Sequence, residues 1–112
     1  MTRDTKDRLT DIREAVKSIQ AHVGGSLDEP EVANELVLHA VLFNFLVIGE
    51  AAKSINDELR SAAPEIRWAD YAGLRDIIAH QYFRVQKQII EDTIRKDLPI
   101  LEVAIDRLIA EA

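Results

Sequence analysis

The segment Leu36–Ile48 constrains the fold more than any other part of the chain, because all of its residues except His39 and Asn44 are apolar. A surface helix carries one apolar stripe, whereas a helix that is apolar on every side is buried from several directions. A chain of 112 residues has few other helices to cover it. The segment therefore predicts either the central helix of a monomeric bundle or, as we favour, a helix that also contacts a second copy of the chain.

Hydrophobic periodicity before this segment is also helical. A first helix is predicted by apolar residues spaced three and four positions apart, which are Leu9, Ile12, Val16, Ile19 and Val23. Gly24-Gly25 is expected to end it. Pro30 suits a first helical turn, and Asp28 and Glu31 are spaced as a capping box, so we expect the second helix to begin near Pro30.

The second half of the chain continues the helical pattern. A short helix is predicted over Trp68–Ile78, and a last apolar stripe extends over Ile89–Ile109. Pro99 lies inside that stripe and is expected to kink or split it, with Asp97 as a cap. No segment shows strand-like alternation of any length. We therefore predict one all-α domain over residues 1–112, a bundle of four to five helices.

The chain has no cysteine, which excludes a disulfide framework, thiolate chemistry and cysteine-ligated zinc. Glu35 and His39 share one side of the apolar helix. However, a di-metal helical bundle needs paired Glu-x-x-His motifs, and the sequence has none. A metal-binding helical enzyme is therefore disfavoured, and we predict no metal and no cofactor.

The first seven residues are polar and do not form the apolar core of a signal peptide. The longest apolar stretch, Ala40–Gly49, is interrupted by Asn44 and is too short to span a bilayer. These features predict a cytoplasmic protein without a membrane partner.

The formal net charge is −6, from 14 Lys and Arg residues against 20 Asp and Glu residues. Broad electrostatic binding of nucleic acid needs a basic surface, so this balance counts against it. A local cationic cleft is still compatible with the sequence. It would have to be gathered by the fold from Arg60, Arg67, Arg75, Arg84 and Lys87.

Three chemically active side chains, Arg75, His80 and Tyr82, lie within eight residues of a helical segment. A guanidinium binds phosphate and an imidazole transfers protons near neutral pH, which is what phosphodiester cleavage without a metal requires. A separation of five residues places Arg75 and His80 about 140° apart around a helix. Either the helix ends near His80, or a symmetry-related copy completes the site. Asp76 is four residues before His80 and is predicted to orient its ring.

The same residues also have purely structural interpretations. Asp76 and His80 could form an ordinary helix pair, and Arg75 could be a solvated or salt-bridged charge. Glu50 follows the apolar segment and needs a partner, for which Arg75 and Lys53 are the candidates. We predict a structural role for Glu50, because an anion beside a phosphate site would hinder RNA.

With its flanking blocks, this motif resembles the HepT-type toxins of the HEPN superfamily. The superfamily motif is Arg, four to six residues and then His, to which the HepT form adds Tyr two residues later. The residue after Arg is usually polar, often Asn, and is Asp76 here. Further blocks stand in family order: Ile48-Gly49-Glu50-Ala51-Ala52, Pro64-Glu65-Ile66-Arg67-Trp68, Gly73-Leu74-Arg75, His80-Gln81-Tyr82-Phe83 and Asp97-Leu98-Pro99. The resemblance covers most of the chain after the first helix.

The resemblance implies a homodimeric HEPN-like bundle that acts as a metal-independent endoribonuclease toxin, with the motifs of both subunits in one cleft. Arg75 would bind the scissile phosphate. His80 would act as general base or acid and give a 2′,3′-cyclic phosphate and a 5′-hydroxyl. The partner in this type VII-like module would be an MNT-type nucleotidyltransferase antitoxin, which transfers AMP onto Tyr82 and so blocks RNA. Arg84 and Lys87 would rim the RNA cleft.

The runner-up interpretation is a non-catalytic HEPN-like module that binds a nucleotide or a nucleotidyltransferase partner without cutting RNA. The net charge of −6 favours this module. The complete set of Arg75, His80 and Tyr82 favours the ribonuclease.

Overall fold

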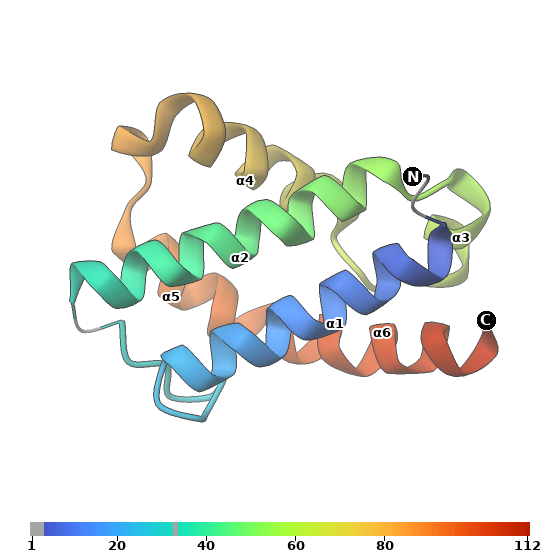
Figure 1. Ribbon diagram of the computed structural model, residues 1–112, viewed down its shortest axis with the longest axis horizontal. Coiled ribbons are helices and arrows are strands. Elements are labelled where there is room, and N and C mark those ends of the chain that lie inside the picture. Colours follow the sequence, from blue (N-terminus) through green and yellow to red (C-terminus); the bar gives the residue numbers. More distant parts are fainter. Residues whose placement is uncertain (1–3, 33) are drawn as a thin grey trace.

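The computed structural model describes residues 4–32 and 34–112, and this part of the chain is helical, with no strand. Its α-helices are α1 (Thr5–His22), α2 (Glu35–Ser54), α3 (Asp57–Ala62), α4 (Trp68–Gln81), α5 (Lys87–Lys96) and α6 (Leu98–Glu111), and a 3-10 turn covers Tyr82–Arg84. The predicted all-α bundle is confirmed, with six α-helices in the described residues rather than four or five (Figure 1).

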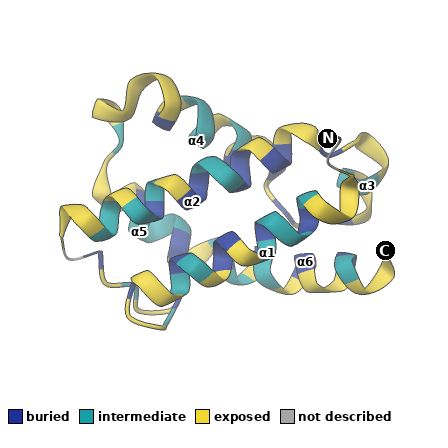
Figure 2. Ribbon diagram, viewed as in Figure 1, coloured by how far each residue is buried: buried dark blue, intermediate teal, exposed yellow. Residues whose placement is uncertain are grey.

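Helix α2 is the central element and packs against α1 on one side and α4 on the other (Figure 1). Its buried side chains include Val41, Phe45 and Ile48. By length and composition alone α2 could cross a bilayer, but these residues form the core of the bundle. Leu36 and Phe43 remain exposed on the same helix, and exposed residues recur along α2 in Figure 2. The prediction that this helix is buried from several directions is therefore correct for only part of its surface, because one side of α2 remains exposed.

The predicted start of the second helix near Pro30 is wrong. Helix α2 begins at Glu35, and the side chain of Asn34 accepts a hydrogen bond from the backbone N–H of Val37 at 3.0 Å. The proposed capping box does not form, because the backbone N–H of Glu31 donates to the carbonyl oxygen of Val23 at 2.8 Å instead. The Ser26 hydroxyl accepts from the backbone N–H of Asp28 at 3.2 Å and stabilises a turn, and residues 24–32 lie outside any helix.

Two further features differ from those predicted. Helix α3 was not predicted. It begins after Asn56, whose side chain accepts from the Leu59 N–H at 2.9 Å. Pro99 splits the last stripe as expected, into α5 and α6. Asp97 stands at the junction, but its side chain does not cap α6. Its backbone is already in the helical region, whereas a capping residue is normally extended.

Gly49 sets the distance between α2 and α4. A Cβ atom placed on Gly49 would lie 2.2 Å from the Cβ of Arg75 and 2.7 Å from the carbonyl oxygen of Tyr71. Any side chain here would force the two helices apart. The backbones of α2 and α4 therefore approach closely at Arg75, the arginine of the motif.

We expect Gly49→Ala to lower the free energy of unfolding by about 1–3 kcal/mol, because the added methyl group overpacks the contact between the helices. Gly73→Ala is the matched control, since a Cβ atom on this α4 glycine meets nothing within 4 Å. It should raise the free energy of unfolding by about 0.5–1 kcal/mol, the usual gain for alanine in a helix. Urea unfolding at one fixed protein concentration measures both. Equal changes in the two variants would contradict the close approach.

Candidate active site

The motif lies where α4 ends. The helix stops at Gln81, one residue after His80, and the chain tightens into the 3-10 turn over Tyr82–Arg84. Gln81 itself leaves the helical region, with φ of −143°. The helix does end near His80, but His80 still lies inside it, so the helix alone leaves Arg75 and His80 about 140° apart around its axis. Backbone geometry therefore changes direction between Arg75, inside the helix, and Tyr82, beyond it.

The guanidinium of Arg75 is held by a carboxylate of α2 and by that of the next residue. Its Nε lies 3.1 Å from Oε2 of Glu50 in an ion pair, and its Nη1 donates to Oδ1 of Asp76 at 3.1 Å. The Arg75 side chain is 26% exposed. Of the two partners that the sequence offered for Glu50, Arg75 is the one it binds. The guanidinium is thus fixed in direction while part of it still reaches the surface.

Asp76 pairs with cations rather than with the imidazole. Its Oδ1 accepts from Lys53 Nζ at 2.8 Å and from Arg75 Nη1 at 3.1 Å. These two bonds, that of Lys53 first, lower the pKa of the Asp76 carboxyl below its ordinary value. No hydrogen bond joins Asp76 to His80 in the residues that the structure describes. The arrangement assigns Asp76 to the arginine and gives no support to its predicted role in orienting His80.

His80 and the next four residues, through Arg84, are exposed. The Tyr82 side chain is 71% exposed, and its ring meets that of Phe83 edge to face at a centroid distance of 6.1 Å. Most of the Tyr82 surface is therefore open to solvent. Arg84 donates to the side-chain oxygen of Gln81 at 2.9 Å, and Lys87 begins α5. Both predicted rim residues stay at the surface just beyond the motif.

Two of the five cations proposed for a local cleft lie elsewhere in ordinary structural contacts. Arg60 donates to the carbonyl oxygen of Ala52 at 2.9 Å, at the end of α2. Arg67, the residue before α4, pairs with Asp70 in the first turn of that helix. The fold therefore does not gather all five into one basic surface.

A surface cavity of about 350 Å³ lies beside Arg75 and Glu50. Its walls come from α1, α2 and α4, and they include Arg8, Leu46 and Ala79. The sequence gave no reason to connect Arg8 with the motif, because the two are far apart along the chain. Only the packing of α1 on α2 brings this second guanidinium to the cavity.

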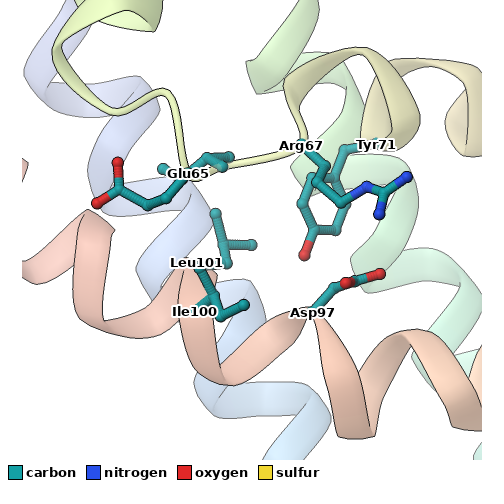
Figure 3. Close-up of a pocket in the computed structure, with 7 residues that line it drawn as sticks. Glu65, Arg67, Tyr71, Asp97, Ile100 and Leu101 are labelled. Atoms are coloured by element: carbon teal, nitrogen blue, oxygen red, sulfur yellow. The ribbon is translucent and has the colours of Figure 1, made fainter.

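A second, smaller pocket lies near the start of α4 (Figure 3). There the Tyr71 phenol and the Asp97 carboxylate face the same space. Tyr71 is 3% exposed, and its hydroxyl has no hydrogen-bond partner among the described residues. Burial raises the pKa of this phenol. The pocket contains no motif residue. No group of three or more potential metal-binding side chains occurs in the described parts of the chain.

Comparison with known proteins agrees with the helical fold and with the motif. The model of the family described as "Ribonuclease HepT-like" matches residues 12–108. The chain therefore belongs to the HepT-like ribonuclease family, and the resemblance inferred from the motif is confirmed.

Several relatives align over most of their length. The "Probable ribonuclease HepT" of Thermococcus cleftensis is 32% identical over 108 residues, which is 96% of this chain and 98% of the relative. A "Putative RNase" of Methanocaldococcus jannaschii is 29% identical, over 93% of this chain and 95% of the relative. A "Putative RNase" of Caldanaerobacter subterraneus is 33% identical, over 78% of each chain. No solved structure gives a significant match.

Proposed function

We propose that this protein is a metal-independent endoribonuclease and the toxin of a two-component module. The observation that carries the proposal is that one helix presents both a held, partly exposed guanidinium and an exposed imidazole, in a family of ribonucleases. Arg75 binds the scissile phosphate and stabilises charge that develops on its oxygens. His80 takes the proton of the ribose 2′-hydroxyl or gives one to the leaving 5′-oxygen.

The proposal includes a homodimer, in which the twofold-related His80 takes the second proton-transfer role. Support comes from the exposed side of α2. Leu36 and Phe43 lie two turns apart and are 78% and 64% exposed, and Val47 continues the same side one turn further. Val47 also lines the cavity beside Arg75. A second copy packed on this apolar side would place two motifs close to one cleft.

An MNT-type nucleotidyltransferase is the proposed partner, and Tyr82 is the proposed acceptor of AMP. The exposed position of the Tyr82 ring at the end of α4 supports this assignment. Bulky negative charge at this position would repel RNA phosphates from Arg75 and block entry to the site. A cytoplasmic location, where RNA and such a partner are both present, is part of the same proposal.

Replacement of either motif residue should stop RNA cleavage. We expect His80→Ala and Arg75→Ala each to lower the cleavage rate by about 100-fold or more, because each removes a transition-state interaction. Lys17→Ala, an exposed charge on α1, is the control and should cleave as the parent does. Cleavage of a labelled RNA by the purified proteins measures this. A fully active His80→Ala variant would refute the site. Absence of cleavage by the parent, with tight binding of the nucleotidyltransferase, would identify the non-catalytic module instead.

Disruption of the exposed side of α2 should separate the subunits. We expect Phe43→Glu to convert the dimer into a monomer and to abolish cleavage, although every motif residue is retained. Val103→Glu is the matched control, since Val103 on α6 is 70% exposed and Phe43 is 64% exposed. It should remain dimeric and active. Light scattering after size-exclusion chromatography gives the mass, and a monomeric parent with full activity would contradict the composite site.

Co-expression with the nucleotidyltransferase should add AMP to the protein. Intact mass spectrometry should show one or more AMP increments, together with loss of RNA cleavage. The increments should vanish in Tyr82→Phe, which keeps the ring but removes the acceptor hydroxyl. If Tyr82→Phe shows the same number of AMP increments as the parent, the modification lies at another residue.

A further inference from the structure

The end of α2 bears three consecutive contacts with the helix turn that carries Arg75. Gly49 allows the backbones to approach, Glu50 forms an ion pair with Arg75 Nε, and Lys53 binds Asp76. Glu50 and Lys53 are three residues apart in a helix, so they lie on neighbouring positions of one side. This surface, formed by Gly49, Glu50 and Lys53, is called the α2 platform below.

The contacts on the α2 platform connect Lys53, through Asp76, to the guanidinium of Arg75. Lys53 and Arg75 share a single oxygen, Oδ1 of Asp76, at 2.8 and 3.1 Å. The Lys53, Asp76 and Glu50 side chains are 42%, 48% and 56% exposed, so an isolated pair between any two of them would contribute little to stability. A shared oxygen makes the position of one cation depend on the other. Lys53 therefore fixes the acceptor to which Arg75 Nη1 donates.

A guanidinium has five N–H groups, and the platform occupies only some of them. Nη1 donates to Asp76 and Nε forms an ion pair with Glu50, while Nη2 makes no hydrogen bond or ion pair in the described part of the chain. The remaining N–H groups are those that an incoming phosphate can meet. The carboxylates of Glu50 and Asp76 beside Arg75 alone would give the cluster a net negative charge. Lys53 supplies the second positive charge that keeps the cluster of four neutral instead of anionic.

We propose that Lys53 is a positioning residue of the ribonuclease site, acting through Asp76 to hold Arg75 with its unbound N–H groups toward the RNA phosphate. This inference rests on the proposed function. It differs from a direct role, in which Lys53 itself binds a phosphate, because a direct contact would not need Asp76.

Kinetics of cleavage separate these roles. For Lys53→Met, kcat/KM should fall about tenfold, mainly through kcat, because the arginine is misplaced in the transition state. Lys53→Arg, which restores a cation able to reach Asp76, should recover most of the loss. Lys17→Met is the matched control and should match the parent. Thermal unfolding of each variant confirms that it folds.

A double-mutant cycle gives the decisive comparison. If Lys53 acts through Asp76, then Lys53→Met should cause little further loss in a protein that already carries Asp76→Asn. If Lys53 binds phosphate directly, the two losses should multiply, and the proposal is overturned. Equal activity of Lys53→Met and the parent would overturn it as well.

A measurement made without RNA tests the positioning of Arg75 separately from the proposed function. The Arg75 Nη–H signals in low-temperature ¹⁵N NMR spectra, assigned by their absence in Arg75→Lys, should exchange faster with water in Lys53→Met than in the parent or Lys17→Met, because Nη1 donates to the Asp76 oxygen that Lys53 holds. If the parent cuts no RNA but this change occurs, the proposed function fails and the positioning of Arg75 by Lys53 stands. An unchanged signal would refute the positioning whatever the activity.

Discussion

The close approach of α2 and α4 at Gly49 is the contact on which the rest of the site depends. Without a side chain at Gly49, the backbone of α4 lies against α2, and Arg75 is delivered to the carboxylate of Glu50 and, through Asp76, to Lys53. The same contact buries the central part of α2. The packing of the core and the orientation of Arg75 therefore both follow from the close approach of α2 and α4. This explains why the buried Gly49 directly precedes Glu50.

The charge balance of the chain is misleading as a guide to its ligand. A net charge of −6 counts against a basic RNA-binding surface. Opposite charges gather around Arg75, and in the proposed function a single phosphate meets its free N–H groups although the protein is acidic. Arg8 adds a second guanidinium at the neighbouring cavity. Recognition in the proposed function then depends on a few placed cations and not on the average field of the surface.

Much of this architecture could be predicted from the sequence, and the failures have physical causes. The apolar segment Leu36–Ile48 and the stripe broken by Pro99 predicted helices whose packing the structure confirms. The start of α2 was missed because the Glu31 N–H, which Asp28 was expected to cap, donates to the Val23 carbonyl oxygen, and Asn34 caps the helix further along the chain. The role of Asp76 could not be predicted, since spacing within a helix favours His80, while its actual partner Lys53 comes from another helix. Contacts between helices leave no periodic signal in one sequence.

The chemistry of the cleaved RNA ends tests the central claim most directly. Mass spectrometry of a defined oligonucleotide, cut by the purified protein in the presence of EDTA, identifies both new termini. The Arg75–His80 site predicts a 2′,3′-cyclic phosphate and a 5′-hydroxyl, formed at the same rate with and without the chelator. Cleavage that EDTA abolishes and added Mg²⁺ restores, or products that carry a 5′-phosphate, would contradict it.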